Sequence, residues 1–304
     1  MPIPDFQSIM LPVLKIAGDG KEHNQSEVKE VIALQFQLND AERNEMLPSG
    51  RQTRLGNRVA WSIVYLRKAG LLENSRRGIF HITDEGMNLL KKDPSRIDIK
   101  LLMQYPGIQE WHKPSRKNED NDTEAADATN QQTPEEVLEA SYQELRRSLA
   151  QELLDKIMAC SPKFFEQLVV DLLVSMGYGG SRKDAGEAIG HSGDDGIDGI
   201  IKEDKLGLDA VYIQAKRWNG TVGRPVVQAF AGSLEGQRAK KGIMISTSQF
   251  SQDAKDYVTR IEKKIILIDG EQLAQYMIDN NVGVAEMVNY SVKRVDLDYF
   301  DEEQ

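Results

Sequence analysis

A short strand-like segment and the glycine-rich loop before it carry residues that could do chemistry together. Gln214 and Lys216 lie two residues apart in VYIQAKRW, and Asp198 lies sixteen residues before Gln214 in GDDGIDGII. Side chains alternate along a strand, so Gln214 and Lys216 share one face and Ala215 points to the other. If Asp198 ends the neighbouring strand, its carboxylate can approach both side chains.

This set of groups favours a magnesium site. The Asp198 carboxylate, the Gln214 amide oxygen and the backbone carbonyl of Ala215 are oxygen donors of the kind that Mg²⁺ binds. Lysine does not ligate Mg²⁺, so Lys216 is expected to hold a water near a scissile phosphate and to stabilise developing negative charge, while the metal lowers the pKa of that water. The predicted reaction is hydrolysis of a phosphodiester bond.

Other metal and cofactor sites fit the sequence poorly. A calcium loop starting at Asp194 would place Gly196 at its third position and Lys205 at its twelfth, where a glutamate is needed. The four histidines are scattered, with His191 near the acidic loop interpreted as a loop residue, and GYGGS completes no nucleotide-binding fingerprint. A single cysteine, Cys160, excludes an intramolecular disulfide.

The elements that position the site are predicted downstream of residue 134. Two helices separate at Ser161 and Pro162, with Ser161 as N-cap. Alternating segments then predict the order strand, strand, helix, strand, helix, strand, helix. This order is typical of an α/β sandwich with helices on both faces of a mixed sheet.

The first 112 residues predict a different domain, built from helices and a hairpin. Apolar residues recur at helical spacing in three runs, with Asn24 or Ser26 and Asn39 or Asp40 as start signals, and again in LGNRVAWSIVYLRKAGL. LLENSRRGIFHIT then predicts a small hairpin. This is the plan of a winged helix, in which the last helix would present Arg51, Arg54 and Arg58 near its start and the hairpin tip would present Arg76 and Arg77 to DNA. Trp61 and Tyr65 are interpreted as core residues.

The net charge of −10 taken over the whole chain argues against a polyanionic partner, but the charge is unevenly distributed along the sequence. Residues 118–139 hold eight carboxylates and no lysine or arginine, whereas residues 51–77 hold seven basic residues against one acid, Glu73. The polar stretch 113–134 is predicted to be a flexible acidic linker between a DNA-recognition domain, residues 1–112, and a catalytic domain, residues 135–304. Winged helices also bind proteins, and arginines are common on solvated helix faces, but this basic patch favours DNA.

The motif GDDGIDGII followed by YIQAKRW resembles the PD-(D/E)xK nuclease superfamily in a variant with glutamine at the acidic position. FEQLVVDLLVSMGYGG, IQAKRWNGTVGRPVVQAFAGSL, GIMISTSQFSQDA and the N-terminal region extend the likeness to the Mrr family of modification-dependent type IV restriction endonucleases over nearly the whole chain. The resemblance implies cleavage of foreign methylated DNA with Mg²⁺. It places the metal carboxylate on Asp198, the acidic-position equivalent on Gln214, the lysine on Lys216 and a further acid on Glu166, whose spacing permits either a solvated or an inward carboxylate.

Partners and location follow from the same pattern. Double-strand cleavage needs two active sites, so a homodimer or higher oligomer is expected while the enzyme cuts. No run of about 20 apolar residues is present, so the chain is expected to be cytoplasmic and associated with the nucleoid when active. Two alternatives stay open: a structure-specific nuclease acting on branched DNA, and an inactive DNA-binding protein, because Gln214 removes one charge from the metal site.

Overall fold

The computed structural model describes residues 2–76, 78–111, 131–178, 196–202, 209–296 and 299. The chain forms two compact units, one of Met1–Tyr142 with Arg294–Gln304 and one of Gln143–Lys293. The division falls inside one helix, eight residues beyond the linker end expected at residue 134. Each unit is described by itself below. No helix of the described residues is long and apolar enough to cross a membrane.

The first unit is mainly helical and contains a small antiparallel sheet. Its strands are β1 (His23–Asn24), β2 (Leu72–Arg76) and β3 (Ile79–Ile82), in the order β1-β3-β2. The helices are α1 (Phe6–Ala17), α2 (Gln25–Gln35), α3 (Asp40–Arg43), α4 (Arg54–Lys68), α5 (Asp84–Lys91), α6 (Ile99–Leu102) and α7 (Pro106–Trp111).

Local sequence signals set where these helices begin. Asn24 caps α2 by accepting a hydrogen bond from the Glu27 amide, and Asn39 caps α3 in a reciprocal capping box with Glu42. The two-residue strand β1 was not predicted, because two residues carry no alternation that a sequence pattern could detect.

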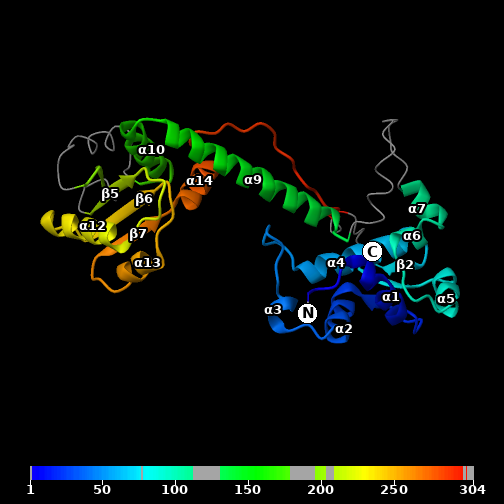
Figure 1. Ribbon diagram of the computed structural model, residues 1–304. Helices are drawn as coiled ribbons and strands as arrows, with labels where there is room; N and C mark the ends of the chain where they lie inside the picture. Colours follow the sequence, from blue (N-terminus) through cyan, green and yellow to red (C-terminus); the bar gives the residue numbers. More distant parts are fainter. Residues whose placement is uncertain are drawn as a thin grey trace. The chain divides into compact units, whose positions relative to one another are not determined.

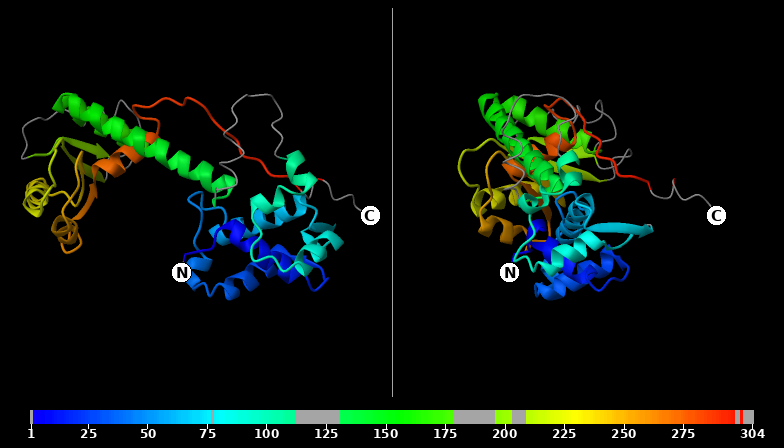
Figure 2. Two further views of the ribbon diagram at one scale, coloured as in Figure 1. Left: turned by 45° about the vertical axis from the view of Figure 1, so that its right-hand side comes forward. Right: turned by 90° about the vertical axis from the view of Figure 1, so that its right-hand side faces the viewer.

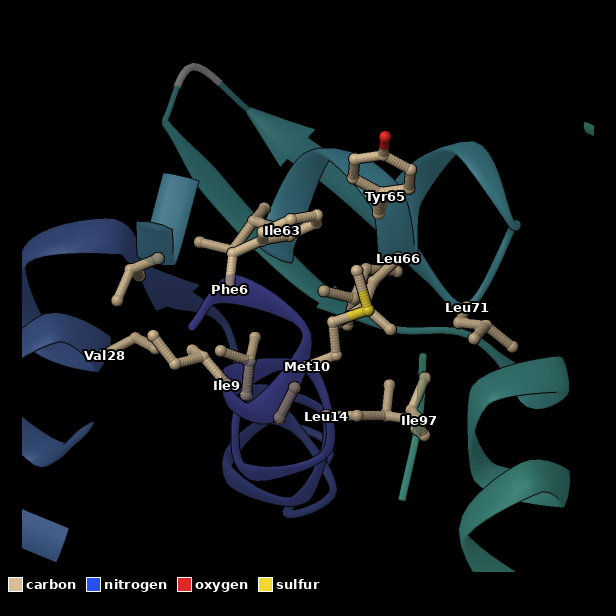
Figure 3. Packing of buried hydrophobic residues seen from close by; sticks show 14 of the residues in the cluster. Phe6, Ile9, Met10, Leu14, Val28, Ile63, Tyr65, Leu66, Leu71 and Ile97 are labelled. Atoms are coloured by element: carbon tan, nitrogen blue, oxygen red, sulfur yellow. The ribbon is translucent and has the colours of Figure 1, made fainter. Parts of the chain in front are cut away.

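One apolar core holds the first unit together. Phe6, Ile9, Met10 and Leu14 of α1 face α4 and the segment after it, as Figure 3 shows for the labelled side chains. The expectation for Tyr65 is confirmed, since its side chain is buried in this core. Trp61 only packs against the core from its edge and is half-buried.

The second unit has the predicted order of elements. Its helices are α9 (Pro134–Ala159), whose first residues belong to the first unit, α10 (Pro162–Ser175), α12 (Arg224–Gly236), α13 (Gln252–Val258) and α14 (Gly270–Asp279). Its strands are β4 (Gly199–Lys202), β5 (Ala210–Lys216), β6 (Lys241–Ser246) and β7 (Lys264–Ile268). Ser161 caps α10 and Pro162 occupies its first turn, as predicted.

The sheet of the second unit is mixed and covered on both faces. Its order is β4-β5-β6-β7, with β4 antiparallel to β5 and the other two pairs parallel. One core joins the sheet to α9, α10 and α14, and a second core joins it to α12 and α13. In Figure 1, α10 and α12 accordingly lie on opposite sides of the strands. Burial on both faces explains the apolar run of β6, whereas β7 lies at the edge of the sheet and leaves Ile266 exposed.

Helix α9 is one continuous helix of 26 residues, which the green ribbon of Figure 2 shows in two views. Thr133 starts it with a capping box, because the Thr133 amide donates to Glu136 Oε2 (2.9 Å) and the Glu136 amide donates to Thr133 Oγ1 (3.3 Å). Leu153 and Ile157 near its end are buried in the core of the second unit.

Candidate active site and candidate nucleic-acid interface

Asp198 immediately precedes β4 and is fixed against β5 by two hydrogen bonds. Its amide donates to the Ile213 carbonyl (2.8 Å), and its Oδ2 accepts from the Ala215 amide (2.8 Å). The carboxylate is half-buried. Burial raises the pKa of Asp198, while the Ala215 hydrogen bond and the charge of Lys216 act in the opposite direction. The sequence expectation that Asp198 and the QAK segment meet between neighbouring strands is consistent with this geometry.

Gln214 is buried beside Asp198 with one end of its amide held and the other end without a partner. Its Nε2 donates to the Gly196 carbonyl, and no described group hydrogen-bonds to its buried Oε1. Gly196 allows this approach, because a Cβ there would lie 2.7 Å from Gln214 Nε2 and its φ of +89° disfavours other residues. A buried amide oxygen without a donor costs free energy unless something binds it.

Glu166 and Lys216 complete the cluster. Glu166, on α10, is half-buried; burial and repulsion from Asp198 raise its pKa, and the charges of Lys163 and Lys216 partly offset the rise. The structure therefore places Glu166 within electrostatic reach of both Asp198 and Lys216, with its side chain partly buried. Asp194, Asp195 and His191 lie outside the described residues.

Arg217, which the sequence patterns did not single out, anchors the end of β5. Its Nη1 donates to the Met158 carbonyl (3.2 Å) and to the Cys160 carbonyl at the end of α9. A cation on the last carbonyls of a helix is favourable, because they carry the negative end of the helix dipole. Arg217, the residue after Lys216, thus fixes the end of β5 against the end of α9.

The residues present fit a divalent cation. Asp198, Glu166 and the Oε1 atom of Gln214 are oxygen donors in one cluster, and the unpartnered Oε1 is the atom that a cation would satisfy. The Ala215 amide already donates to Asp198, which orders the strand carrying the expected carbonyl ligand. Among the described residues, no group of three or more His, Cys, Asp or Glu side chains lies so that it could hold a metal ion.

The five arginines predicted to meet DNA have different surroundings. Arg51 is exposed in the loop before α4, and Arg76 is 72% exposed with a contact of 3.3 Å to Glu22. Arg77 lies outside the described residues. Arg54 and Arg58 are on the first turns of α4 as predicted, but they are not free.

Glu136 binds both helix arginines. Its Oε1 accepts from Arg54 Nη1 (3.2 Å) and Arg58 Nε (3.0 Å), and its side chain is only 2% exposed. Arg58 Nη1 also donates to the Ile3 and Pro4 carbonyls, at 2.7 and 3.0 Å. Sequence reasoning missed this contact, although Thr133-Pro134-Glu135-Glu136 carries the spacing of a capping box and so predicts a helix start there.

Comparisons with known proteins match both halves of the chain to described families. Residues 157–277 match a family described as restriction endonuclease, and residues 6–92 match one described as the Mrr N-terminal domain. The type IV methyl-directed restriction enzyme EcoKMrr of Escherichia coli (strain K12) is 36% identical over 99% of this chain and 100% of its own length. The solved MspJI restriction endonuclease in complex with a 27-mer oligonucleotide is 18% identical, with the match covering 67% of this chain and 42% of that chain at a TM-score of 0.27.

The mixed sheet with helices on both faces, the family match and the likeness to EcoKMrr define a restriction endonuclease, a hydrolase that cleaves DNA. The chain belongs to the Mrr family. The resemblance seen in the sequence is thereby confirmed for both halves of the chain. Restriction endonuclease domains generally use divalent metal ions, as expected here.

Proposed function

We propose that this enzyme hydrolyses phosphodiester bonds of methylated double-stranded DNA with Mg²⁺ at the cluster of Glu166, Asp198, Gln214 and Lys216. The observation that carries the proposal is the buried Gln214 Oε1, which has no partner among the described residues. The next residue in the strand, Ala215, donates its amide to Asp198 Oδ2 and so fixes that carboxylate beside Gln214. The relative named above is methyl-directed, which supports the substrate.

Each side chain has a distinct role in the proposed reaction. Asp198, Gln214 Oε1 and Glu166 would hold the cation, with the Ala215 carbonyl as a further donor. Bound Mg²⁺ would lower the pKa of the attacking water and neutralise phosphate charge. Lys216 supplies a positively charged side chain at the reacting phosphate. It orients the attacking water and stabilises the negative charge that develops on the phosphate oxygens. Arg217 positions the neighbouring Lys216, because its guanidinium group donates a hydrogen bond to the Cys160 carbonyl at the end of α9.

The first unit has the element order of a winged helix, and we propose that it reads the site on DNA. The helix α4 follows α2 and α3, the hairpin β2 and β3 follows α4, and β1 completes the sheet. In this arrangement α4 would enter the major groove and the exposed Arg76 near the hairpin tip would meet phosphate. Cleavage of both strands would require two copies of the chain on one DNA site.

Cleavage of plasmids with different defined methylations tests the proposal directly. Purified protein should cut or nick a methylated plasmid with Mg²⁺ and leave the unmethylated plasmid intact, and Lys216→Ala should abolish cutting. Equal cutting of both plasmids would contradict the substrate, and a preference for a four-way junction over methylated duplex would indicate a structure-specific nuclease instead. Undiminished cleavage by Lys216→Ala would contradict the site.

A further inference from the structure

The start of α9 covers one face of α4. Arg54, Asn57, Arg58 and Trp61 lie three or four residues apart and so share one face of that helix. Three acidic or polar residues at the start of α9 contact all four of them: Thr133, Glu135 and Glu136. All of these residues belong to the first compact unit.

The contacts match the chemistry with which proteins contact DNA. Thr133 Oγ1 donates to Asn57 Oδ1 (2.5 Å), which leaves Asn57 only 2% exposed, and Trp61 Nε1 donates to Glu135 Oε2. Arginine at phosphate or guanine and asparagine at adenine are the side chains that proteins use on DNA, and a carboxylate between two guanidinium groups occupies the place of a phosphate. The opposite face of α4, with Leu55, Val59 and Leu66, is buried in the core.

The hydrogen bonds and ion pairs that attach the covering segment to α4 are made by polar side chains. No residue from 131 to 142 belongs to the apolar core of the first unit, and Val137 and Leu138 are 36% and 50% exposed. Releasing the segment therefore leaves that core intact. Glu135 and Glu136 belong to the acidic stretch 118–139, whose charge is opposite to that of the basic patch 51–77.

We propose that residues 133–136 are an intramolecular competitor of DNA. In the free enzyme they occupy the face of α4 formed by Arg54, Asn57, Arg58 and Trp61, here called the reading face, and they leave it when DNA binds. The inference rests on the proposed function in one respect, namely that α4 is the DNA-reading helix. DNA displaces the segment because its phosphates engage Arg54 and Arg58 together with Arg51 and Arg76, which two carboxylates cannot do. Binding of DNA to the first unit is thereby coupled to release of the first turn of α9.

Equilibrium binding of the full-length protein tests the competition. A fluorescently labelled methylated duplex is titrated without divalent cations, and its Kd is measured by anisotropy for the wild type, for Glu135→Gln/Glu136→Gln and for Arg54→Ala/Arg58→Ala. The glutamine variant should bind about tenfold tighter, because the fraction of protein with an open reading face rises. Glu144→Gln/Glu152→Gln is the matched control, since it also removes two negative charges, from exposed positions of α9, and should leave Kd within about twofold.

The two ways of failing give different results. If the glutamine variant binds like the wild type while the arginine variant binds more weakly, the competition is wrong and the reading role of α4 stands. If neither variant changes Kd, both the competition and the reading role of α4 are wrong.

Hydrogen exchange of the wild type provides a second measurement that needs no substitution. With saturating DNA and no divalent cation, the backbone amides of residues 134–142 should exchange faster than in the free protein, because the segment has been released. Unchanged or slower exchange in this segment on DNA binding would overturn the proposal even if the variants fold poorly.

Discussion

Replacing Glu136 with alanine should destabilise the first unit by about 2 to 3 kcal/mol. The Glu136 side chain is 2% exposed and accepts hydrogen bonds from Arg54, Arg58 and the Thr133 amide. Removing one partner of a buried ion pair costs about 3 to 5 kcal/mol, because the remaining charge is left buried.

The loss of unfolding free energy expected for Glu136→Ala lies below that range, because both arginines keep other partners. Arg54 keeps a contact of its Nε with Glu45 Oε1 (2.7 Å), and Arg58 keeps the Ile3 and Pro4 carbonyls. The side chains of Arg54 and Arg58 are 29% and 12% exposed, so water can reach part of each guanidinium group. The double change Arg58→Ala/Glu136→Ala should show a coupling free energy of at least about 1 kcal/mol.

Urea unfolding followed by tryptophan fluorescence measures this free energy. Trp61 and Trp111 stack with ring centroids 6.4 Å apart in the first unit, so a Trp218→Phe background makes the signal report that unit alone. Glu144→Ala is the control and should cost less than about 0.5 kcal/mol. A cost for Glu136→Ala as small as that of the control would refute the reasoning that Glu136 is held by the two arginines.

Three further predictions concern the catalytic cluster. Lys216→Ala should lower the rate of plasmid cleavage at least about 100-fold while leaving the melting temperature and the Kd for DNA unchanged; loss of folding would contradict a purely catalytic role. Gln214→Glu should tighten Mg²⁺ binding measured by calorimetry, because it restores a carboxylate, and an unchanged affinity would remove Gln214 from the ligand set. Asp198→Asn should abolish cleavage yet raise the melting temperature of the metal-free protein at pH 7: burial raises the pKa of Asp198, so its charge costs stability above the folded-state pKa and the cost disappears as the pH falls through it. A lower melting temperature for Asp198→Asn would count against this cost.

The order of elements in the second unit could be predicted because each element carries its own local signal. Ser161 and Pro162 start α10 through a cap and a first-turn proline, and the apolar run of β6 reflects burial on both faces of the sheet. The alternation of a strand likewise placed Gln214 and Lys216 on one face before any contact was known. The short strand β1 carried no such signal and was missed.

The surroundings of the charged residues could not be read in the same way. The spacing of residues on α10 is compatible with a Glu166 carboxylate that faces either solvent or the interior. Its electrostatic surroundings depend on Asp198, which lies 32 residues later in the chain. The clustering of arginines on α4 was evident, but their partner Glu136 is 82 residues from Arg54. A cluster of positive charges in a sequence is compatible both with DNA phosphates and with carboxylates of the same chain, and the sequence pattern does not distinguish the two.

By itself, the sequence determined the family, the elements and the residues that could do chemistry, because periodicity, caps and motif spacing depend on neighbours along the chain. Only the tertiary structure decided that Gln214 Oε1 is buried with no partner among the described residues, that the charge of Asp198 acts on Glu166, and that Glu135 and Glu136 contact one face of α4. Those properties depend on burial and on contacts between distant segments, which set the free energy of a charge or a hydrogen-bonding group in the folded protein.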